Sequence, residues 1–110
     1  MQEGEVFIVN YLKIKYEGSV FISVISPKED SNGDIVFISG CAVYKYLKKS
    51  GETIKIAGSH NSGDKDGPNN ETLFCSPYYL IFDSKDRIII SDAYNNEIKR
   101  IDCKKEIQLQ

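Results

Sequence analysis

Hydrophobic and polar positions alternate with a period of two along most of the chain, and no window of a dozen residues shows a helical period. Alternation bounded by clusters of Gly, Pro, Asn, Asp and Ser predicts half-buried β-strands. The predicted strands are residues 5–10, 11–16, 19–26, 34–39, 42–48, 52–58, 78–83, 87–92, 97–102 and 106–110. We therefore expect an all-β chain with antiparallel sheets of short strands.

Two polar stretches interrupt this alternation. Residues 26–34, SPKEDSNGD, combine Pro, Asn-Gly and several acids, a composition that predicts a turn. Residues 58–71, GSHNSGDKDGPNNE, are rich in Gly, Asn and Asp and predict a long connection between strands.

The segment at 33–48 repeats at 85–102. GDIVFISGCAVYKYLK aligns with KDRIIISDAYNNEIKRID when Ser39 is matched to Ser91, 52 residues later, and the first copy lacks two residues in the following turn. Tyr44 is then matched to Ile98, 54 residues later, and 4–16 holds a weaker copy. Repeats of short antiparallel strands are typical of β-propeller blades, which stack face to face because one blade cannot bury both its faces.

The better repeat resembles the NHL-repeat β-propeller family. Its ordered elements are AGSHNSGDKDG, LFCSP, YYLIFD, SKD, RIIISD, AYNN and EIKRID. The resemblance implies four-stranded antiparallel blades of a partial NHL-type propeller within a single domain, residues 1–110. The expected parts are a degenerate partial blade at 1–32, a first blade with its connection at 33–75 and a second blade at 76–110. It also implies a set of structural turn residues, namely Asp66, Gly67, Asp83, Asp92, Asn95 and Asn96.

Two copies and a fragment are fewer than the roughly four to eight blades that close a propeller. Three arrangements remain open: a piece of a longer propeller, copies that self-associate, or an arc that collapses into a small sandwich. The first is favoured, because an open arc exposes apolar blade faces.

The resemblance also implies a function. Propellers bind partners through loops, because a rigid sheet scaffold holds variable loops in place. We therefore expect a non-enzymatic interaction or scaffold module that binds a protein partner. The candidate partner-binding residues are His60, Asn61, Asp64, Lys65, Asn69 and Tyr94.

Charge introduces an alternative. The formal net charge of −2 argues against a nucleic-acid-binding domain that works by bulk charge. Lys alternates with Ile and Tyr in the predicted outer strands, a pattern that also fits one solvated strand face. The alternative is RNA binding through these strands, helped by Tyr44 and Tyr46. Its candidate residues are Lys45, Lys48, Lys49, Lys99 and Arg100.

Catalytic or metal chemistry has weak support in the sequence. The acids of 64–71 are oxygen ligands suited to Ca²⁺, but the EF-hand spacing fails because Asn69 stands where Gly is required. His60 is the only histidine, so a zinc site lacks ligands. Lyases with NHL-like propellers use several inward-facing histidines around a metal, a set that this sequence does not supply. We expect no enzyme activity, no metal and no cofactor.

The cysteines and the N-terminus bear on location. Three widely spaced cysteines fit reduced thiols better than a disulfide framework. The N-terminus shows no secretory signal, and the longest apolar-looking segment, 6–25, is interrupted by Lys13, Lys15 and Glu17. We therefore expect a cytoplasmic protein without a membrane span.

Overall fold

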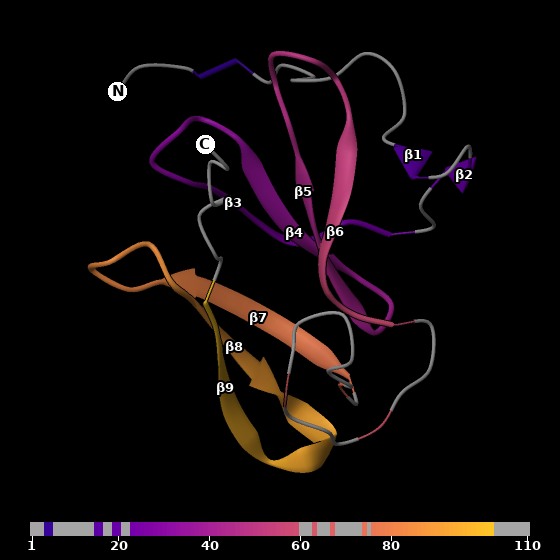
Figure 1. Ribbon diagram of the computed structural model, residues 1–110, viewed down its shortest axis with the longest axis vertical. Coiled ribbons are helices and arrows are strands. Elements are labelled where there is room, and N and C mark those ends of the chain that lie inside the picture. Colours follow the sequence, from indigo (N-terminus) through magenta and orange to yellow (C-terminus); the bar gives the residue numbers. More distant parts are fainter. Residues whose placement is uncertain are drawn as a thin grey trace, which may run out of the picture.

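The computed structural model describes residues 4–5, 15–16, 19–20, 23–59, 63, 67, 74 and 76–102. They form β-strands and one 3-10 helix (Figure 1). The elements are β1 (Lys15–Tyr16), β2 (Ser19–Val20), β3 (Ile25–Glu29), β4 (Ile35–Ser39), β5 (Ala42–Tyr46), β6 (Thr53–Gly58), β7 (Pro77–Phe82), β8 (Ile88–Asp92), η1 (Ala93–Asn95) and β9 (Glu97–Ile101). Within the described residues, no helix has the length and apolarity needed to cross a membrane.

The strands form three sheets in chain order. β1 pairs with β2, β3 to β6 form a four-stranded sheet, and β7 to β9 form a three-stranded sheet. Every pairing is antiparallel. An all-β chain with antiparallel sheets is thus confirmed for the part of the chain that the structure describes.

The predicted strands from 34–39 onward match β4 to β9 closely. Short apolar or alternating runs that end at turn residues located these strands. Predicted strand 106–110 and nearly all of 5–10 lie outside the described residues, and 11–16 and 19–26 are described only in part.

The predicted turn at 26–34 is wrong in its first half. β3 occupies Ile25–Glu29 and pairs with β4, so the turn is confined to 30–34. The pairing register shifts between Ile25 and Lys28, and Ser26 has a φ of 53°. This bulge breaks the period of two, and Pro27 is tolerated because β3 is an edge strand. The predicted boundary between 32 and 33 therefore falls inside a hairpin, and the four-stranded sheet begins at Ile25.

The same turn closes the first hairpin of each larger sheet. Asp30 Oδ1 accepts hydrogen bonds of 2.9 Å from the backbone N–H groups two and four residues later. Asp83 Oδ1 accepts the matching pair, also at 2.9 Å. The residue three positions on has a positive φ in both turns, 86° at Gly33 and 62° at Asp86. The two sheets therefore repeat with a spacing of 83 − 30 = 53 residues along their first hairpins.

This spacing corrects the predicted alignment by one residue. Ser39, the last residue of β4, corresponds to Asp92 rather than to Ser91. Ser39 pairs with Ala42 across a gap of two residues, and Asp92 pairs with Glu97 across a gap of four. The predicted two-residue deletion in the first turn is thus confirmed. The one-residue correction also applies to the alignment of β5 with β9. A slip of one residue exchanges the two faces of a strand, so it decides which side chains are equivalent.

The two larger sheets pack face to face around one apolar core. Its buried members are Val36, Ile38, Val43, Ala57, Phe74, Leu80, Ile88, Ile90 and Ile101. β7 lies beside β3 and β4 (Figure 1). The backbone N–H of Leu80 donates a hydrogen bond of 3.1 Å to Ser26 Oγ, which joins β7 to β3.

The opposite face of the four-stranded sheet holds a second buried cluster. Phe37, Ala42 and Tyr44 belong to it, with Tyr46 packed against them. The rings of Phe37 and Tyr44 stack with centroids 5.7 Å apart. Both faces of this sheet are therefore buried, because alternate residues of β4 supply the two clusters.

Candidate functional site

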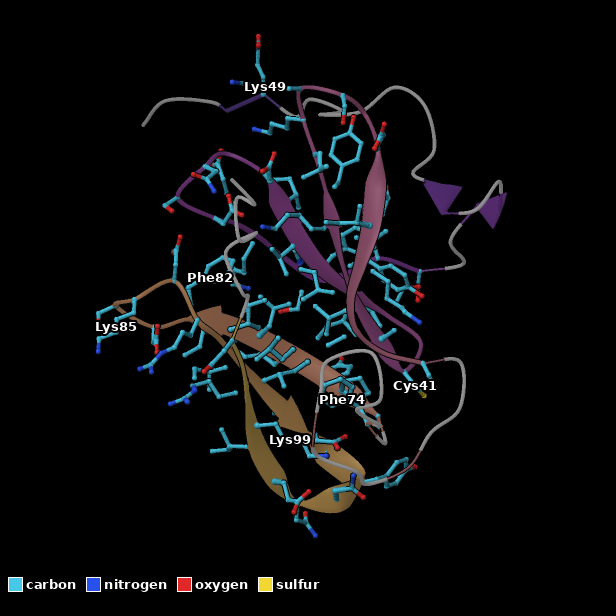
Figure 2. All side chains as sticks on the ribbon, in the orientation of Figure 1. Cys41, Lys49, Phe74, Phe82, Lys85 and Lys99 are labelled. Atoms are coloured by element: carbon cyan, nitrogen blue, oxygen red, sulfur yellow. The ribbon has the colours of Figure 1, made fainter. Side chains whose placement is uncertain are left out.

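The two larger sheets have a connection end and an Asp-turn end. We define the connection end by Gly40, Cys41, Gly58, Gly63, Phe74, Ser76 and the 93–96 turn, and the Asp-turn end by the turns 30–34, 47–52 and 83–87. Figure 2 shows Cys41, Phe74 and Lys99 near one another and Lys85 at the far end of β7. Of the predicted partner-binding residues, Tyr94 lies at the connection end.

Hydrogen bonds join the long connection to η1. Asn95 Nδ2 donates to the backbone oxygen of Gly63 at 3.0 Å and to Asp92 Oδ2 at 2.7 Å. The backbone N–H of Ala93 donates to the oxygen of Ser76 at 3.1 Å, and that of Gly63 to the oxygen of Phe74 at 2.9 Å. The 93–96 turn thereby holds both the middle and the end of the connection.

A buried ion pair lies beneath this junction. Lys99 Nζ is 3.3 Å from Asp92 Oδ2, and the two side chains are only 9% and 0% exposed. Lys99 Nζ also lies 5.4 Å from the ring centre of Phe74 and 3.7 Å from Glu97 Oε1. Removing one charge from such a pair is costly because the other then stays buried without compensation. The pair therefore ties β8 and β9 to the end of the connection.

Gly58 allows the closest backbone approach at this end. Its φ is +91°, and a Cβ there would lie 2.5 Å from the backbone oxygen of Cys41 and 2.8 Å from Cα of Ala42. Phe74 Cδ2 would lie 3.1 Å away. Only glycine combines this backbone conformation with this approach.

Tyr94 is the most exposed aromatic side chain at the connection end. It lies in η1 with 79% of its surface exposed, directly before the residue that holds Gly63. Tyr94 was a predicted partner-binding residue. The others, His60, Asn61, Asp64, Lys65 and Asn69, lie outside the described residues.

The predicted turn residues have different roles. Asp83 accepts turn N–H groups as expected, and Asn96 ends η1 in the left-handed region, with φ 55°. The side chains of Asn95 and Lys99 contact the Asp92 carboxylate. Gly67 has a φ of 137°, and Asp66 lies outside the described residues.

The predicted RNA-binding cations are divided between the two larger sheets. Lys45 is paired with Asp30 at 3.2 Å, Lys48 with Glu29 at 3.3 Å, and Arg100 with Asp102 at 2.6 Å. Lys99 is buried against Asp92, and Lys49 is exposed on the β5–β6 turn. Four of these five cations are thus held by carboxylates, on two different sheets.

A groove at the Asp-turn end was not predicted from the sequence. It has a volume of about 480 Å³ and lies between the sheets, with Lys45, Phe82, Lys85 and Asp86 among its lining residues. Ser31 Oγ donates a hydrogen bond to the Asp86 carboxylate, which joins the two Asp turns. Both signs of charge line this groove.

Asp83 is expected to titrate below its ordinary pKa of 3.8. Desolvation raises the pKa of Asp83, but hydrogen bonds from the backbone N–H and guanidinium of Arg87 and from the N–H of Lys85, together with the Arg87 charge, lower it by more. The carboxylate therefore stabilises the fold above the unfolded-state pKa, and this contribution is lost as pH falls through the lowered folded-state pKa.

The measurement is an NMR titration of the Asp83 carboxyl from about pH 2 to 6, a range that spans ordinary carboxyl pKa values. Arg87→Met should raise the pKa of Asp83. An unshifted pKa in the wild-type chain, or no response to this substitution, would contradict the role of the turn.

Candidate metal ligands do not cluster in the part of the chain that the structure describes, where no three His, Cys, Asp or Glu side chains could hold one ion. The thiol of Cys41 is free. Cys75, Cys103 and His60 lie outside the described residues.

No protein-family model matches the sequence, and no curated protein matches it significantly.

Proposed function

We propose that this chain is a non-enzymatic interaction module, built as two successive blades of an NHL-type β-propeller, which binds a protein partner at its connection end. The supporting observation is the junction of the long connection with η1, where Asn95 holds Gly63 and Tyr94 stands exposed.

The way in which the sheets stack supports the propeller part of this proposal. Val36 and Ile38 point from the first sheet toward the second, whereas Ile88 and Ile90 point from the second toward the first. With the spacing of 53 residues, Val36 corresponds to Ile89, on the other face of β8. The sheets therefore meet through non-equivalent faces, as successive blades do, whereas a symmetric sandwich joins equivalent faces.

The rigidity of the connection end supports the binding part. Exposed aromatic side chains on well-held turns are frequent anchors of protein interfaces, because little conformational entropy is lost when they are covered. Tyr94 has this setting, since η1 is bonded to the connection and its neighbours carry the buried ion pair.

The test is quantitative affinity capture from the source cell with the wild-type chain and with Tyr94→Ala. We expect a partner whose recovery falls about 10-fold or more in the variant, the usual loss for an aromatic anchor. Asn95→Ala should lower recovery as well, because it frees Gly63 from η1.

The matched control is Lys85→Ala, which changes an equally accessible turn at the other end of β7 (Figure 2). Its captured proteins should equal those of the wild type. If Tyr94→Ala and Lys85→Ala capture the same proteins in the same amounts as the wild type, the connection end is not the binding surface.

A further inference from the structure

The groove at the Asp-turn end opens onto the apolar core between the two larger sheets. Val36 and Lys45 line it from the first sheet, and Phe82 and Ile88 line it from the second. Val36 and Ile88 are buried members of the core, and Phe82 packs against the core while partly buried. Figure 2 shows Phe82 and Lys85 at this end of β7. An occupant of the groove would therefore meet an apolar surface between two charged turns.

One charge of each sign in the groove has no ion-pair partner. Lys45, Arg87 and Asp102, which also line it, are already held in ion pairs. Lys85 and Asp86, in contrast, form no ion pair with any other residue that the structure describes. Charged groups across an interface are arranged so that their signs are complementary. A well-matched occupant therefore carries both an anion and a cation beside an apolar part.

The chain itself leads into this groove. Asp102, the residue directly after β9, belongs to the lining. The next eight residues, 103–110, read CKKEIQLQ and lie outside the described residues. Sheets stacked face to face lie about 10 Å apart, and an extended chain advances about 3.3 Å per residue. Three or four residues beyond Asp102 are therefore enough to cross from the second sheet to the first.

The composition of 103–110 matches that of the groove. Lys104, Lys105 and Glu106 supply both signs of charge. Ile107 and Leu109 alternate with glutamines, so an extended segment directs both aliphatic side chains to one side. The segment thus offers a mixed-charge part followed by an apolar face.

A return of this segment along β9 lacks a suitable turn residue. Each hairpin turn of the two larger sheets contains a residue with a positive φ, and these residues are Gly33, Gly40, Gly51, Asp86 and Asn96. Gly, Asn and Asp adopt this conformation at the lowest cost. Residues 103–105 are Cys-Lys-Lys, and Asp102 is not among the residues with a positive φ. This stretch is therefore better suited to continue across the gap between the sheets than to turn back.

We propose that residues 103–110 dock in the groove of their own chain. Residues 104–106 lie beside Lys85 and Asp86, and Ile107 and Leu109 cover the apolar lining at Phe82. The segment then joins the sheets at the Asp-turn end, as the bond between Asn95 and Gly63 secures the connection end. The inference does not rest on the partner-binding surface at Tyr94, so failure of docking and failure of partner capture are separate results.

The test is NMR spectroscopy of the full chain, with NOEs measured between the methyl groups of Ile107 and Leu109 and the ring of Phe82. We expect these NOEs in the wild-type chain, because docking brings the three side chains into contact. Ile107→Asp should lower the docked population at least about 10-fold, since it places an unpaired carboxylate against the apolar lining. The NOEs from Leu109 to Phe82 should then disappear.

The matched control is Gln108→Asp, which adds the same charge on the opposite side of an extended segment. It should keep the NOEs to Phe82, and circular dichroism should show both Asp variants folded. In a mixture of labelled and unlabelled chains, the NOEs should arise within one molecule.

Four results would overturn the proposal. The first is a wild-type chain without NOEs from Ile107 and Leu109 to Phe82, and the second is strand-type NOEs between 106–110 and the backbone of β9. The third is contacts that arise only between different copies. The fourth is an equal response of the NOEs to Ile107→Asp and Gln108→Asp.

Discussion

Gly58→Ala is expected to cost about 4 kcal/mol or more of folding free energy, since overpacking and backbone strain act together. The added Cβ would lie 2.5 Å from the backbone oxygen of Cys41 and 2.8 Å from Cα of Ala42, and backbone atoms cannot rotate away as a side chain can. Alanine would also have to hold a φ of +91°. The free energy of unfolding of a small domain is only about 5 to 15 kcal/mol, so a large fraction of the variant molecules should be unfolded near body temperature.

The measurement is the midpoint of urea denaturation, and Gly51→Ala is the matched control. Gly51 also has a positive φ, +76°, but no atom lies within 4 Å of its Cβ position. We expect about 1 to 2 kcal/mol there from backbone strain alone. Equal losses in the two variants would show that the close approach at Gly58 contributes nothing.

Lys99→Met is expected to cost about 3 to 5 kcal/mol, the usual loss when one partner leaves a buried ion pair. Methionine replaces much of the apolar stem, but the Asp92 carboxylate, 0% exposed, loses the ammonium group 3.3 Å away. Thermal unfolding followed by circular dichroism measures the loss. Adding Asp92→Asn should recover part of it, because the amide carries no charge into the interior.

Arg100→Met is the matched control for this pair, one residue further along β9. Its ion pair with Asp102 is half exposed, at 51% and 56%, so its removal should cost no more than about 1 kcal/mol. If Lys99→Met is as mild as Arg100→Met, the buried pair does not stabilise the connection end.

The strands could be predicted because short apolar or alternating runs end at turn residues along the chain. β3 could not be predicted, because the bulge at Ser26 interrupts the alternation of polar and apolar residues. Pro27, in addition, is a residue typical of turns. The one-residue error in the repeat has a similar cause. Matching Ser39 to Ser91 aligned more identical residues. The structurally equivalent residues, however, are defined by Asp30 and Asp83, whose carboxylates accept matching hydrogen bonds in the two turns.

The candidate site was predictable only where its contacts are local. Asp83 bonds to groups at most four residues away, and the family resemblance implied its role in the turn. Lys99 was predicted to lie on an exposed cationic surface, although the register of the β8–β9 hairpin indicates a position beside Asp92. Asp92 pairs with Glu97, so alternation places Lys99 on the same face as Asp92. The close approach at Gly58 depends on β5 and Phe74, and no pattern within its own strand indicates it.

The two prolines at the leading edges have a consequence for how this chain meets other chains. Pro27 and Pro77 lie in β3 and β7, the first strands of the two larger sheets, and each stands beside a break in register. A foreign strand added along either border would find a missing amide donor and a distorted backbone. Strand-by-strand, fibril-like growth is therefore disfavoured along these two borders.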